Sequence, residues 1–157
     1  MKIQSIYFLV LTLLISVNSF AQDNERKFKI HTLAFYNLEN LFDTINDVNK
    51  NDEASPIMEI KFNRSGIYKQ KITNMAKVIS EIGYEVTKRP PSIVGICEVE
   101  NRKVVEDLIS NKKLENHNYG IVHYESPDDR GIDVGLIFNK DVFLSLIHIS
   151  EPTRLSW

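Results

Sequence analysis

The sequence predicts an α/β domain with a mixed sheet, because four segments of strand character alternate with two segments of helical periodicity. The expected order along the chain is strand, helix, strand, helix, strand, strand. Composition agrees, since 43% hydrophobic and 25% charged residues in a chain of 157 are ordinary values for one globular domain. These values exclude a disordered chain and a collagen-like repeat.

Residues 28–37 begin with alternating polar and apolar residues and become almost wholly apolar, which predicts a first strand entering the core. Residues 43–56 are rich in Asn and Asp without an apolar period, so we expect a solvated loop with no helix. A covering helix should follow, ending near Gly83. Its lysines fit a solvated outer face and are assigned no function. The apolar residues at helical spacing are Tyr68, Ile72, Met75, Ala76, Ile79 and Ile82.

After Pro90-Pro91, residues 92–99 form a short apolar run of the kind found in buried strands. Asn101 can cap a second helix. The last two strands are expected at residues 119–124 and 132–138. The inward side of the second helix would carry Val104, Val105, Leu108 and Ile109.

Charge and cysteine content limit the possible functions. A formal net charge of -2 supplies no general cationic field to gather nucleic acid or coat an anionic membrane. Any polyanionic substrate must therefore be held by local groups. The lone Cys97 cannot form an internal disulfide, and the sequence has no CxxC or Cys/His zinc pattern.

Residues 1–21 have the pattern of a cleaved export signal. Lys2 supplies positive charge, residues 6–17 are apolar, and Ser19-Phe20-Ala21 resembles an A-x-A cleavage site. The apolar run is too short for a membrane anchor, which needs about 20 residues. We expect the mature protein to begin at Gln22 and to be periplasmic or extracellular.

The opposite end has the features of a foreign sequence. Residues 144–154 (LSLIHISEPTR) are identical to one reading frame of a widely used sequencing adapter. We therefore interpret residues 144–157 as a non-native tail and exclude them, including His148, from functional argument. The alternative is a genuine strand that ends in a turn at Pro152.

Two polar residues stand at the ends of apolar strands. Glu98 would suffer a desolvation cost unless a partner or cation compensates it. Equally, it could be a structural acid that accepts backbone hydrogen bonds or pairs with Arg102. Asn37, taken alone, is better explained as a turn cap. Because ligands of α/β sheets collect at the carboxyl ends of strands, the two residues together suggest a site. Their hard oxygen atoms suit Mg²⁺, or Mn²⁺ or Ca²⁺, and phosphate chemistry is the natural use of such a site.

Three segments carry a family resemblance. Residues 34–43 (AFYNLENLFD) resemble the first motif of the endonuclease/exonuclease/phosphatase family, and residues 93–101 (IVGICEVEN) resemble its second. Residues 126–138 (SPDDRGIDVGLIF) look like a stretch found in exported bacterial members. The resemblance implies that residues 22–143 are the N-terminal part of a four-layer α/β/β/α sandwich with mixed sheets.

The resemblance also implies roles for individual residues. Asn37 and Glu98 would be catalytic residues that hold the metal, Mg²⁺ or else Mn²⁺ or Ca²⁺. Arg130 could bind a substrate phosphate through its forked donors, or it could instead fix its own turn with Asp128 or Asp129. Asp133 could shape the site, although tying the loop to the following strand is the favoured role.

The resemblance finally implies metal-dependent hydrolysis of phosphoesters by an exported, monomeric enzyme, with nucleic acid favoured over phospholipid as substrate. The family's later motifs, Gly-Asp-Phe-Asn and Ser-Asp-His or similar, do not occur in the sequence. None of His31, His117 and His123 matches the family's histidine. We therefore expect a truncated, inactive and unstable chain with uncovered sheet faces. The alternative function is an exported, non-catalytic binding module on the same fold.

Overall fold

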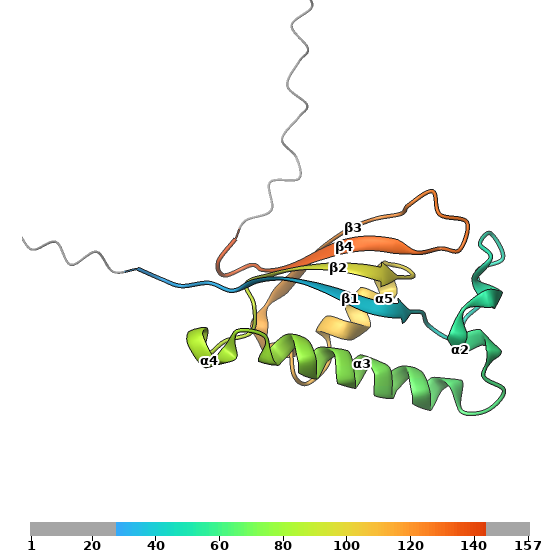
Figure 1. The fold of residues 1–157 in the computed structure, drawn as a ribbon, viewed down its shortest axis with the longest axis horizontal. Helices are drawn as coiled ribbons and strands as arrows, with labels where there is room; N and C mark the ends of the chain where they lie inside the picture. The colour runs from blue at the N-terminus through green and yellow to red at the C-terminus, as the bar shows by residue number, and fades with distance from the viewer. Residues whose placement is uncertain (1–27, 144–157) are drawn as a thin grey trace, which may run out of the picture.

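The computed structural model describes residues 28–143, which form one mixed four-stranded sheet covered on one face by helices (Figure 1). The strands are β1 (Leu33–Leu41), β2 (Ile93–Val99), β3 (Tyr119–Tyr124) and β4 (Asp133–Asn139). They lie in the order β1-β2-β4-β3. β1 and β2 are parallel, and β4 is antiparallel to both β2 and β3. The predicted α/β class with a mixed sheet is therefore confirmed.

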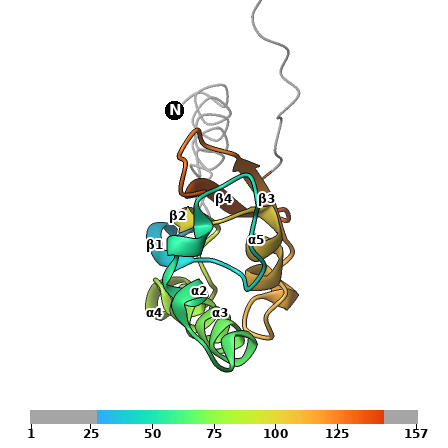
Figure 2. The same ribbon diagram turned by 90° about the vertical axis from the view of Figure 1, so that its right-hand side faces the viewer.

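The helical layer consists chiefly of α3 (Arg64–Glu81) and α5 (Arg102–Ile109), which lie on the same side of the sheet (Figure 2). α3 ends as expected, because Gly83 takes a positive φ of 69° directly after its C-cap. At the start of α5, the Asn101 side chain accepts a hydrogen bond from the Val104 N–H at 2.9 Å, so the predicted cap is confirmed.

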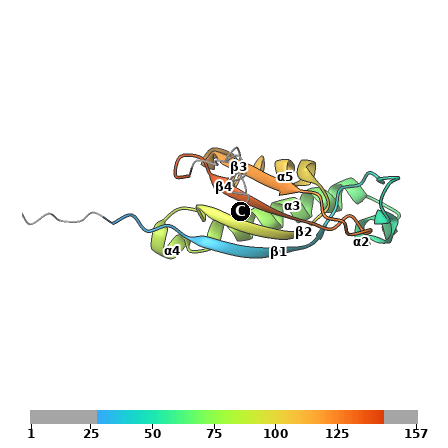
Figure 3. The same cartoon turned by 90° about the horizontal axis from the view of Figure 1, so that it is seen from above.

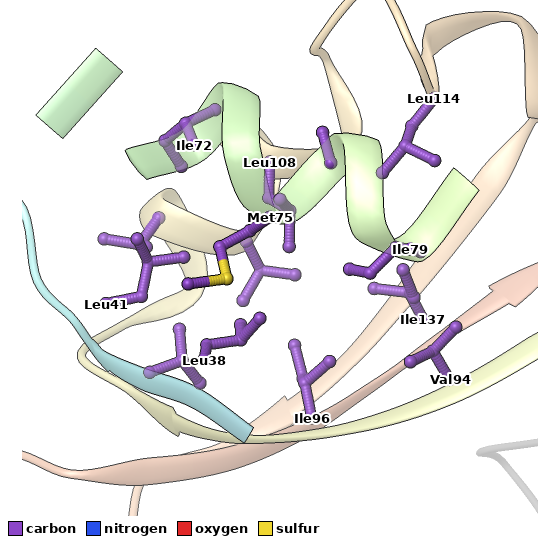
Figure 4. Packing of buried hydrophobic residues seen from close by; sticks show 14 of the residues in the cluster. Leu38, Leu41, Ile72, Met75, Ile79, Val94, Ile96, Leu108, Leu114 and Ile137 are labelled. Carbon is purple, nitrogen blue, oxygen red and sulfur yellow. The ribbon is translucent and has the colours of Figure 1, made fainter. Parts of the chain in front are cut away.

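Apolar side chains from α3, α5 and the inner side of the sheet form the core, as Figure 4 shows. Four of the six residues predicted for the inward side of α3 are buried, and Tyr68 and Ile82 are partly buried. In α5, Val104, Val105 and Leu108 are fully buried, as predicted, whereas Ile109 is only partly buried. The periodicity of the sequence thus identifies the sides of both helices that face the sheet.

Several element boundaries differ from the predictions. β1 begins later than expected, at Leu33, and continues past Asn37 to Leu41. The loop at 43–56, predicted without helix, contains a short 3₁₀ turn, η1 (Asp52–Ala54), and its last residue starts the one-turn helix α2 (Pro56–Glu59). The structure also adds α4 (Tyr84–Thr87) and the 3₁₀ turn η2 (Glu115–His117). These single turns are too short to produce an apolar period in the sequence.

The second face of the sheet carries large apolar side chains that the described residues leave exposed. Figure 3 looks onto this face, with the helices behind the strands. The exposed fractions are 64% for Leu33, 91% for Phe35, 65% for Tyr124 and 60% for Val134. Residues 28–143 therefore form two layers, one of sheet and one of helices. The four-layer sandwich stays a prediction, and the export signal and the tail at 144–157 lie outside the described residues.

No helix within residues 28–143 is both long and apolar enough to cross a membrane.

The core predicts a clear contrast between two isoleucines of α3. Ile79 is fully buried and Ile67 is 39% exposed, so replacing each with Ala changes helix propensity equally and burial unequally. We expect Ile79→Ala to lower the free energy of unfolding by about 2–5 kcal/mol and Ile67→Ala by less than about 1 kcal/mol. Urea unfolding followed by circular dichroism measures both values. Equal losses would contradict the packing described above.

Candidate metal centre

The candidate site lies where β1 and β2 lose their regular pairing. The two strands pair in parallel register up to Asn37 and Cys97, and the register then shifts before Leu41 and Val99. Within the irregular segments, Glu39, Asn40 and Glu98 have positive φ values of 52°, 55° and 58°. Such values are uncommon for residues other than glycine and are typical of β-bulges and functional sites. The bulges change the direction of the side chains at this edge of the sheet.

Asn37 and Glu98, the two predicted metal ligands, are brought into direct contact. The Asn37 Nδ2 donates a hydrogen bond to Glu98 Oε1 at 2.8 Å. The other carboxylate oxygen, Oε2, accepts a hydrogen bond from the backbone N–H of Asn40 at 3.1 Å. Asn37 Oδ1 in turn accepts the N–H of Glu39 at 2.6 Å. Residues 61 positions apart in the sequence therefore form one hydrogen-bonded group.

This geometry shows how the side chains could receive a cation. Each carboxylate oxygen of Glu98 uses one hydrogen bond and keeps further acceptor capacity, because an ionised carboxylate offers about four lone-pair sites. Asn37 presents its amide nitrogen to Glu98, so in this arrangement it orients the carboxylate and its own oxygen faces Glu39. In the part of the chain that the structure describes, no three His, Cys, Asp or Glu side chains are grouped to hold a metal ion. The residues present fit a hard ion that keeps most of its waters, as Mg²⁺ does.

Lys71 of α3 is a further residue of the site, one of the helix lysines for which the sequence predicted no function. Its Nζ donates to the backbone carbonyls of Asn40, at 3.0 Å, and of Glu39. It thereby fixes the two left-handed residues that place the Asn40 N–H against Glu98. Partial burial lowers the pKa of Lys71, while the nearby Glu39 and Glu98 charges act in the opposite direction. Its sequence pattern is that of any solvated helix lysine, so periodicity alone could not single it out.

The acid that burial perturbs most in this region is Glu100. The sequence suggested a desolvation cost for Glu98, which is only partly buried. Burial raises the pKa of Glu100 to about 7, helped by the charges of Asp43, Asp52 and Asp47 and opposed by the hydrogen bond from the Asp43 N–H. The suggested pairing of Glu98 with Arg102 does not form either, because Arg102 pairs with Glu106 at 3.2 Å.

Arg130 binds its own turn. Its Nε and Nη2 donate to the two oxygens of Asp128 at 3.0 and 2.8 Å, and its backbone N–H also donates to Asp128. The forked contact to Arg130 lowers the pKa of Asp128 to about 2. The sequence allowed Arg130 either to bind a substrate phosphate or to fix its own turn, and these contacts fix the turn. Its guanidinium nevertheless stays largely exposed.

Asp133 ties the β3–β4 loop to β4, which confirms the role favoured for it from the sequence. Its Oδ1 accepts the backbone N–H of Ser126 at 2.7 Å, and its Oδ2 lies 2.9 Å from His123 Nε2. His31 lies at the opposite end of the sheet, 2.9 Å from the Ser92 hydroxyl. In this arrangement neither histidine contacts Glu98 or Asn37.

The raised pKa of Glu100 predicts a pH-dependent loss of stability. Because the folded pKa of about 7 exceeds the ordinary value of 4.5, the folded state favours protonated Glu100. Stability therefore falls as pH rises through the interval from 4.5 to 7. We expect Glu100→Gln to remove this loss, on the order of 1 kcal/mol after solvent screening.

Thermal unfolding at pH 5 and pH 8, in buffer with a chelator, measures the difference. The Tm of Glu100→Gln should exceed that of the unmodified chain at pH 8 by more than it does at pH 5. A Tm difference between the two proteins that is the same at pH 5 and at pH 8 would contradict the raised pKa of Glu100.

Comparison with known proteins identifies the family. A model of the endonuclease/exonuclease/phosphatase family matches residues 32–155, which is most of the chain and includes part of the segment interpreted as a non-native tail. That interpretation stays a prediction. No curated protein and no solved structure matches the chain. Members of the matched family are typically hydrolases of phosphoester bonds and generally use divalent metals. The chain belongs to the endonuclease/exonuclease/phosphatase family.

Proposed function

We propose that the chain is the N-terminal part of an exported, divalent-metal-dependent phosphodiesterase in which Glu98 and Asn37 form the metal side of the active site. The main support for this proposal is the contact of the Asn37 side chain with Glu98 at 2.8 Å, where the regular parallel pairing of β1 and β2 ends, toward the carboxyl ends of the two strands. Ligand sites of α/β sheets occupy this position. Mg²⁺ is the favoured cation, and a nucleic acid is the favoured substrate.

Each group at this edge has a separate task in the proposed site. Glu98 supplies the negative charge and the oxygen atoms, and the Asn40 N–H and the Asn37 amide fix its orientation. Lys71 holds the backbone that presents the Asn40 N–H. Because these donors are fixed before substrate arrives, the carboxylate needs little rearrangement during the reaction.

A bound Mg²⁺ would polarise the phosphoryl oxygens and offset the charge that develops on them. The chain's own residues would hold the phosphoester next to Glu98. The hydrogen bonds and charge of Asp128 chiefly raise the pKa of Arg130, and the charge of Glu98 adds to them. The exposed guanidinium could turn from Asp128 to a substrate phosphate. The group that activates water would come from the part of the enzyme that supplies the family's later motifs.

Metal binding by the chain itself is the first test. We expect Mn²⁺ to bind the unmodified chain and Glu98→Gln to weaken that binding by about tenfold or more, because the carboxylate charge is lost while its shape is kept. Electron paramagnetic resonance of free Mn²⁺ measures the affinity. Glu81→Gln, an exposed acid at the end of α3, is the matched control and should bind as the unmodified chain does. Equal affinities for all three proteins would refute the assignment of Glu98.

Catalysis is tested in the completed gene product. There, Glu98→Ala should lower Mg²⁺-dependent cleavage of DNA or RNA on the order of 100-fold or more. The same preparations should be assayed on phospholipid, with Mg²⁺ and with chelator, to decide the substrate class. Full activity of Glu98→Ala would overturn the proposal. Activity that is absent even from the unmodified completed protein would favour the non-catalytic binding module.

A further inference from the structure

A pocket lies beside the candidate metal centre, between the loop that follows β1 and the loop that joins β3 to β4. Both loops lie at the end of the sheet toward which β1 and β2 run (Figure 1). The pocket has a volume of about 240 Å³, and we call it the side pocket. Among the residues that line it are Asn40, Phe42, Asn51, Pro56, Arg130 and Ile132.

The side pocket adjoins the Glu98 carboxylate through Asn40. This residue lines the pocket, and its backbone N–H donates to Glu98 Oε2 at 3.1 Å. The two loops that form the walls are joined directly, because the backbone N–H of Asn51 donates to the carbonyl of Asp129 at 2.8 Å. The pocket is therefore formed before a ligand arrives, and a ligand in it would lie next to Glu98.

The walls of the side pocket offer polar groups at some points and apolar surface at others. The side-chain amides of Asn40 and Asn51 form no hydrogen bond with other groups within residues 28–143, so each keeps donors and acceptors for a ligand. Phe42, Pro56 and Ile132 add apolar surface. This combination suits a flat ring with polar edges.

The charge of the side pocket argues against a cationic ligand. Its charged lining residue is Arg130, and in the described part of the chain no carboxylate lines it. The choline or ethanolamine group of a phospholipid would meet no opposite charge there. A neutral ring beside a phosphate fits better.

We propose that the side pocket holds one unstacked nucleobase of a single-stranded nucleic acid whose adjacent phosphate lies at Glu98. The inference rests on the proposed function for the position of that phosphate. A cavity of about 150 Å³ can hold benzene, so the volume of about 240 Å³ is sufficient for the larger ring of a base. Side-chain amides bond to the edges of bases, and guanidinium or apolar groups stack on their faces.

A base in the side pocket would also supply affinity that the rest of the chain lacks. The formal net charge of -2 provides no general attraction for a polyanion, so local contacts must hold the substrate. In a duplex each base is stacked and paired, and extruding one costs free energy that a single strand does not require. We therefore expect the chain to prefer single strands.

The test compares a base-free deoxyribose phosphate strand with the same strand carrying one adenine. Both are labelled with fluorescein, and fluorescence anisotropy in Mg²⁺ buffer gives the Kd of each for the full chain. The adenine strand should bind about tenfold more tightly or better, because it adds edge and stacking contacts. An ordinary single strand should likewise bind more tightly than its duplex.

Variants assign the preference to the side pocket. Asn51→Ala removes the amide and keeps the backbone N–H that joins the loops, and it should lower the adenine preference about fivefold or more. Asn46→Ala, on the same exposed loop but outside the pocket lining, is the matched control and should keep the preference. Glu98→Gln should weaken both strands alike and leave their ratio unchanged. Failure of the metal assignment is thus distinguishable from failure of the pocket.

Four results would overturn the proposal. They are equal affinity for the two strands, binding of neither strand, tighter binding of the duplex, and an unchanged adenine preference in Asn51→Ala. The comparison of strands uses the unmodified chain, so it decides the question even if Asn51→Ala does not fold. Displacement of the adenine strand by phosphocholine as readily as by adenosine monophosphate would instead assign the pocket to a lipid head group.

Discussion

The arrangement of the candidate site depends on the hydrogen-bonded contact between Asn37 and Glu98 across the irregular ends of β1 and β2. Regular parallel strands would continue their alternation past Asn37 and Cys97, and a carboxylate there would follow its position in the pleat. The positive φ of Glu98 breaks this alternation. Backbone strain of this kind persists only where surrounding contacts over-determine it, and here the Asn37 amide and the Asn40 N–H provide those contacts.

The helical layer contributes to the same site. α3 packs on the sheet through Ile72, Met75, Ala76 and Ile79, and this packing places Lys71 over the carbonyls of Glu39 and Asn40. Core packing and site geometry are therefore linked through one helix. The fully buried side chains beneath the site supply the rigidity that the bulged strands cannot supply alone.

The sequence predicted the four strands, the two longer helices α3 and α5 and the inward sides of both helices, because apolar period and capping are local signals. It also selected Asn37 and Glu98, which interrupt apolar strands, and the structure places them in contact. It could not predict the bulges, which depend on how two distant strands pair, or the role of Lys71, which depends on where α3 lies. The burial of Glu100 could not be predicted either, because it depends on the loop at 43–56, whose sequence has no apolar period.

The decisive measurement is a crystal structure of the protein grown with Mn²⁺, with diffraction recorded at the manganese absorption edge. We expect an anomalous peak about 2.0–2.2 Å from a carboxylate oxygen of Glu98, beside Asn37. A fully occupied metal elsewhere in the active site, with Glu98 and Asn37 bonded only to each other and to Asn40, would contradict it.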